Sequence, residues 1–149
     1  LKIWDEEKVL SDVVWAIRTF KPDVIINRFD HRTPGTTHGH HTSSAMLSVE
    51  AFDFANDSSK FSDQLEHTET WQSKRLFFNT SSWFYKSEDE FKNATEGKLT
   101  SVDVGIYYPL KGLSNNEVAS LASSQHLCQG FGRLSVRGNQ NEYIEFLRG

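Results

Sequence analysis

The stretch from residue 24 to residue 79 constrains the fold more than any other part of the chain. It begins with an apolar run over 24–29, continues through a polar loop into a helical pattern from about Thr42, and ends with an apolar run over 75–79. Two strands joined through a helix pair in parallel, by a right-handed crossover, in nearly all known cases. A short continuous apolar run is typical of a parallel strand covered on both faces. We therefore expect an α/β fold with a parallel sheet flanked by helices.

Outside this unit, four segments carry helix or strand signals. They are a helix over 5–20, a strand over 101–107, a helix from 115 to about 129, and a last short strand over 143–147. Pro22 ends the first of these helices. Ser114 and Glu117 form a capping-box pattern that begins the second, and Gly130 ends it. Because no repeat or linker divides the chain, we expect a single domain over 1–149.

Charge and composition exclude several classes of protein. A net charge of −4 disfavours a general nucleic-acid binder, because such proteins present a basic face. No run approaches the roughly 18 apolar residues of a membrane span. Cys128 is the only cysteine in the sequence, so it has no partner for an internal disulfide, and it gives no indication of compartment. Localisation and oligomeric state therefore stay open.

Three histidines lie where the polar loop meets the second helix: His38, His40 and His41. Ligands of open α/β sheets bind in this region, beyond the carboxyl ends of the strands. His38 and His41 are three residues apart at a first helical turn, so their rings can converge on one centre. The positive end of the helix dipole favours neutral imidazoles, which bind metals. Two imidazoles are fewer than the three protein ligands of most catalytic zinc sites, so a metal site and a polar surface loop both remain open.

Motifs in a fixed order give a more specific indication. The chain has Pro-Asp-Val at 22–24, His-Gly-His-His at 38–41 and Ala-Ser-Ser-Gln-His-Leu-Cys-Gln at 122–129. Together they resemble the PIG-L/LmbE-like family of zinc-dependent N-deacetylases, with Cys128 where the family usually has a serine. The resemblance runs from about residue 5 to the end. It implies a Rossmann-like sheet, a Zn²⁺ cofactor and an N-acetylated amino sugar, or its conjugate, as substrate.

By this resemblance His41 is a zinc ligand. His38 is the catalytic residue that stabilises the tetrahedral intermediate or protonates the leaving amine. The family's His-Pro-Asp-Asp motif, which supplies two further zinc ligands and the general base, does not occur in this sequence. We therefore expect an N-terminally incomplete domain that is inactive alone and holds zinc weakly or not at all.

Two alternatives stay open beside the deacetylase. One is a non-catalytic carbohydrate-binding or interaction module with the same fold. The other is a different metal hydrolase that uses the same loop and takes acidic ligands such as Asp30 or Asp103.

Four side chains are candidates for contact with the substrate: Asp30, Arg32, His126 and Gln129. Asp30 follows the first strand, where it can contact a sugar hydroxyl, orient a histidine or cap the turn. Arg32 can reach a substrate hydroxyl or phosphate, or remain a solvated loop arginine. The resemblance puts His126 and Gln129 near the pocket, although a capping role at the end of the last helix also fits them.

Overall fold

Two helices that pack against each other hold the main apolar core. The computed structural model describes residues 3–129, 132 and 137–149. In it, α1 (Glu6–Phe20) packs on α2 (Gly39–Phe54) through buried side chains at helical spacing. These are Leu10, Val14 and Ile17 on α1, with Leu47, Ala51 and Ala55 on or just after α2. Asp5 caps α1 and Lys21 ends it in the left-handed conformation, directly before Pro22. The first predicted helix is confirmed.

The sheet confirms an α/β fold and corrects the prediction of a parallel sheet. Its strand order is β1 (Val24–Asn27), β2 (Arg75–Thr80), β6 (Asn141–Arg148) and β3 (Leu99–Asp103). β1 and β2 pair in parallel around α2, as expected. β6 is antiparallel to both of its neighbours, so the sheet is mixed. The reason is that β6 returns along β3 after an excursion of the chain, as the second strand of a hairpin does.

The prediction that the first strand is covered on both faces is wrong. Ile25 packs against the core of α1 and α2, and Asn27 on the same face is buried. Val24 and Ile26 point to the other face and are 47% and 57% exposed. Successive side chains of a strand alternate between faces, so the helices cover only half of this apolar run.

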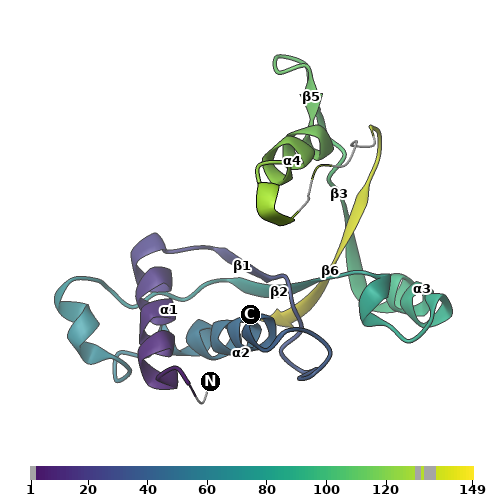
Figure 1. The fold of residues 1–149 in the computed structure, drawn as a ribbon. Helices are drawn as coiled ribbons and strands as arrows, with labels where there is room; N and C mark the ends of the chain where they lie inside the picture. The colour runs from purple at the N-terminus through teal and green to yellow at the C-terminus, as the bar shows by residue number, and fades with distance from the viewer. Residues whose placement is uncertain (1–2, 130–131, 133–136) are drawn as a thin grey trace.

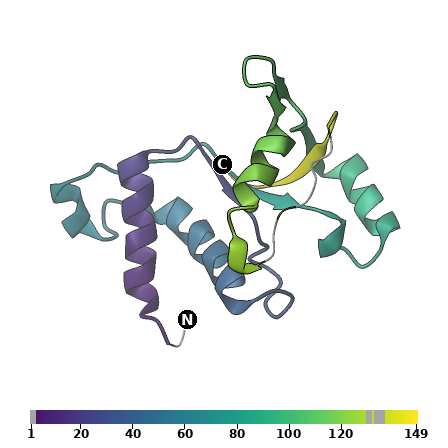
Figure 2. The same ribbon diagram turned by 45° about the horizontal axis from the view of Figure 1, so that its top comes forward.

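Beyond the core, β3 and β6 form an extended arm. Figure 1 shows this pair leading away from α1 and α2 to α4 (Asn115–Ser123) and to the small sheet of β4 (Tyr107–Tyr108) and β5 (Leu113–Ser114). In the view of Figure 2, α3 (Glu88–Gly97) also stands apart from α1 and α2. The exposed surface is 10300 Å², whereas a compact monomer of this mass, 17.1 kDa, exposes about 7,800 Å².

The arm corrects two predicted boundaries. The strand predicted over 101–107 is two strands, because the chain leaves the ladder after β3 and Tyr107 already belongs to β4. The capping box of Ser114 and Glu117 is confirmed, but α4 ends at Ser123, and residues 127–129 form a separate 3-10 turn. Gly130 lies outside the described residues. Among the helices that are described, none has the length and apolarity to cross a membrane.

Candidate functional site

The histidine cluster lies at the start of α2, which begins three residues earlier than the predicted Thr42. His38 is the residue that precedes the helix, and the amides of His41 and Thr42 donate to its carbonyl at 2.9 and 3.4 Å. The side chain of His38 makes no capping bond to the helix and is exposed. The hydroxyls of Thr37 and Thr42 are 3.0 Å apart and tie the end of the loop to the first turn. The loop therefore delivers His38 to solvent at the amino end of α2.

Ring spacing separates one pair of histidines from the other two pairs. The ring centroids of His38 and His41 are 5.6 Å apart, with the planes at 74°. Two imidazoles that share one tetrahedral zinc have centroids about 5 Å apart, given Zn–N bonds of about 2.0 Å. The rings of His40 and His41 are at 4.1 Å, too close to share an ion, and those of His38 and His40 are nearly parallel at 9°. The spacing of His38 and His41 is thus compatible with one shared ion, whereas the family resemblance gives the two rings separate roles, with His41 on the metal and His38 in catalysis.

His41 is held by an aromatic partner. Its ring stacks on Phe29, just after β1, with centroids 3.9 Å apart and planes at 10°. Both rings line a shallow hollow of about 280 Å³ that also includes Asn27 and Ser44. Partial burial, and then the neighbouring His40 and His38, lower the pKa of His41 below its ordinary value. The lowered pKa favours the neutral ring, which is the form that binds a metal.

No complete set of metal ligands is found among the described residues. Across 3–129, 132 and 137–149, no group of three or more His, Cys, Asp or Glu side chains is arranged to hold a metal ion. A catalytic zinc site usually has three protein ligands, and the resemblance assigns only His41 of these residues to the metal. Asp103, an alternative acidic ligand, lies at the end of β3, where its carboxylate accepts the amides of Gly105 and Gln140 at 2.9 Å each.

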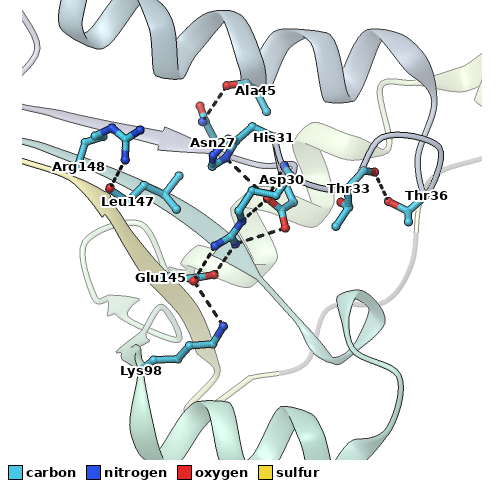
Figure 3. A network of polar contacts seen from close by, with 11 residues as sticks. Asn27, Asp30, His31, Thr33, Thr36, Ala45, Lys98, Glu145, Leu147 and Arg148 are labelled. Carbon is cyan, nitrogen blue, oxygen red and sulfur yellow. Dashed lines mark hydrogen bonds and ion pairs between the residues drawn. The ribbon is translucent and has the colours of Figure 1, made fainter.

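Asp30 and Arg32 bind each other beside this cluster. The Asp30 carboxylate accepts the backbone amide of Arg32 at 2.9 Å, as a turn cap does, and also accepts its Nε at 2.8 Å. The same guanidinium forms a two-pronged ion pair with Glu145 of β6, at 3.0 and 2.8 Å. Lys98 adds a contact to Glu145 at 3.4 Å, and Figure 3 shows this network between the carboxyl end of β1 and the last strand.

The electrostatics of the network favour the charged forms of Asp30, Arg32 and Glu145. The hydrogen bonds from Arg32 lower the pKa of Glu145, against the opposing effect of burial. Burial alone would raise the pKa of Asp30, but its bonds to Arg32 outweigh burial and lower it. Glu145 and then Asp30 raise the pKa of Arg32. The charges of Asp30 and Arg32, which were candidates for contact with a substrate, are engaged within the protein.

His126 and Gln129 follow α4 on the extended arm. Both residues are exposed, and the amide of Gln129 donates to the His126 carbonyl at 3.1 Å within the short 3-10 turn. Figure 1 shows the end of α4 separated from α2. Their contact with a substrate stays a prediction.

Sequence reasoning missed Phe29 and Glu145. Phe29 ends the first apolar run, where a core role fits as well as contact with a ring. The sequence did indicate a structural role for Glu145, because a carboxylate inside a predicted strand requires a partner when it is buried.

No family model matches the sequence, and no curated protein matches it either, so the family remains a prediction from the quoted motifs.

Proposed function

We propose that this chain carries part of the active site of a zinc-dependent N-deacetylase of the PIG-L/LmbE type. The observation that supports this best is the pair His38 and His41, whose rings lie 5.6 Å apart at the amino end of α2, close enough for His38 to act on a substrate held at a metal on His41. The parallel β1–α2–β2 unit gives further support, because ligands of open α/β sheets bind beyond the carboxyl ends of such strands. In this proposal the unit is one half of a Rossmann-like fold.

The two histidines have separate roles. His41 binds the metal through its neutral ring, which the stack on Phe29 keeps in place. Zn²⁺, when bound, polarises the acetamide carbonyl and lowers the pKa of water. His38 hydrogen-bonds to the oxygen of the tetrahedral intermediate or protonates the departing amine. An amide requires such help, because a nitrogen that is not protonated would have to leave as an amide anion, which is a very poor leaving group.

The remaining parts of the site are assigned to a His-Pro-Asp-Asp segment, which this sequence does not contain. That segment would add a histidine and an aspartate to the metal and a second aspartate as general base. The proposed substrate is an N-acetylated amino sugar or its conjugate. Residues 1–149 alone are then expected to release no acetate and to retain little zinc.

The test measures bound zinc and released acetate together. Residues 1–149 are assayed on an N-acetylglucosamine conjugate, alone and with an upstream segment that carries the motif. With that segment, His41→Ala removes zinc, whereas His38→Ala keeps zinc and slows acetate release by about 10²–10⁴-fold. His40→Ala is the matched control from the same turn and leaves both quantities near the wild-type value. Acetate release by residues 1–149 alone contradicts the proposal.

A carbohydrate-binding or interaction module without catalysis is the second candidate. It is a candidate because, among the described residues, no group of three or more His, Cys, Asp or Glu side chains is arranged to hold a metal ion. This candidate predicts that the sugar conjugate binds and that no acetate appears in either assay.

A further inference from the structure

The loop that carries the histidines has few bonds of its own. Between β1 and α2, the amide and the hydroxyl of Thr36 both bond to the Thr33 carbonyl, at 3.3 and 2.8 Å. Gly35 in the same turn has a φ of +91°. A short turn of this kind does not by itself fix the direction of the residues that follow it. The Thr37–Thr42 contact ties the end of the loop to α2, so the position of the rest of the loop depends on how it is anchored to the sheet.

Arg32 provides that anchor by joining the loop after β1 to β6. One side of its guanidinium bonds to Asp30, three residues after the end of β1, and the other side bonds to Glu145 on β6. In the sheet, β2 lies between β1 and β6. The planar guanidinium is suited to this arrangement, because it presents its donors in a rigid fork. Both carboxylates are nearly covered, with side-chain exposures of 11% and 13%.

Glu145 is the fixed end of this connection. Its backbone is in register with Phe78 of β2 on one side and with Leu99 of β3 on the other. The carboxylate therefore projects from a strand that is paired on both edges. Lys98 contacts it as well, at 3.4 Å.

We propose that Glu145, acting through Arg32, is a positioning residue for His38 and His41. The pair of Glu145 and Arg32 holds Asp30 in place, and Asp30 adjoins Phe29, whose ring stacks on His41 with centroids 3.9 Å apart. In this role Arg32 acts through the protein and does not contact the substrate. In the experiment below, the measurement of Zn²⁺ binding rests on the proposed function, whereas the hydrogen exchange of the loop does not.

The experiment compares Glu145→Gln and Arg32→Lys with the wild-type chain. The first substitution keeps the shape of the side chain without its charge, and the second keeps the charge without the fork. Arg137→Gln is the matched control, because it breaks a comparable ion pair with Glu117 of α4, at 2.8 Å. Hydrogen exchange of the Thr36 and His41 amides reports on the loop, and amides of α1 serve as the reference. A Zn²⁺ titration followed through the ring signals of His38 and His41 reports on metal binding at His41 and on its neighbour.

Both test variants should speed exchange of the two loop amides by about tenfold and leave α1 unchanged. They should also weaken Zn²⁺ binding by about 10- to 100-fold, as the loss of groups that orient metal ligands does. Loop exchange in Glu145→Gln that equals that of Arg137→Gln overturns the inference. If Zn²⁺ moves no ring signal of the wild type even with the His-Pro-Asp-Asp segment present, the proposed function fails, and the loop exchange still decides the role of Glu145.

Discussion

The buried side chain of Arg18 on α1 allows a quantitative test of how much its bonds to the end of α2 and to the turns after α2 contribute to the free energy of unfolding. Its side chain is 0% exposed, although it projects from α1 into the core region. It donates at 2.8 to 3.2 Å to five backbone carbonyls, those of Phe54, Ala55, Asp57, Lys60 and Phe61. A sixth bond reaches the side chain of Gln64 at 3.1 Å. One cation thus satisfies carbonyls at the end of α2 and in the turns after it.

Replacing Arg18 with Met removes all six bonds without changing the helix propensity of the position. Two of them, to Ala55 and Gln64, are fully buried, and the others are partly accessible to water. Buried hydrogen bonds to a charged group contribute about 1.5–3 kcal/mol each, so the two buried bonds alone give about 4 kcal/mol. Because whole domains have about 5–15 kcal/mol of stability, Arg18→Met should lose a large part of it. Arg18→Lys keeps the charge but reaches fewer carbonyls, and should lose about 2 kcal/mol.

Urea unfolding followed by tryptophan fluorescence measures these free energies. Arg75→Met is the control, because the Arg75 side chain is exposed and its guanidinium bonds to the adjacent Lys74 carbonyl. We expect the control to cost less than about 0.5 kcal/mol. If Arg18→Met is within about 1 kcal/mol of Arg75→Met, the buried guanidinium does not hold the turns after α2, and the reasoning is refuted. If Arg18→Met has no folded baseline, Arg18→Lys supplies the magnitude.

Three further predictions concern the backbone of Gly35, the pair of Arg32 and Glu145, and the cap of α4. Gly35→Ala should lower stability by about 1–2 kcal/mol because φ is +91°, whereas Gly39→Ala, also with open space around the added carbon, should be neutral or stabilising in thermal denaturation. Arg32 lowers the pKa of Glu145, so the pair stabilises the protein fully above the unfolded carboxyl value of about 4.3 and loses this effect as pH falls through the lower folded value. The melting-temperature gap between wild type and Glu145→Gln should thus be constant from about pH 7 to 5 and close below about pH 4; a constant gap at every pH contradicts this. Ser114→Ala removes the capping box and should speed amide exchange in α4, at a cost of about 1 kcal/mol, with α1 as the unaffected reference.

The sequence was sufficient for elements whose signals are local. The periodicity of α1, the stop at Pro22 and the capping box of Ser114 each depend on residues within one or two helical turns, and the structure has all three. The parallel pairing of β1 and β2 was also predictable, because a strand–helix–strand unit has one favoured connection. The same reasoning placed the three histidines at the start of α2.

The position of β6 and the surroundings of the histidines were decided by tertiary structure. Arg32 and Glu145 are 113 residues apart, and only the return of β6 between β2 and β3 brings their charges together. The stack of His41 on Phe29 and the ring spacing of His38 and His41 likewise depend on side-chain directions set by packing. A local sequence pattern determines the secondary structure of a short segment. It does not determine which distant segment packs or pairs with that segment, because those contacts depend on the burial and strand pairing of the whole chain.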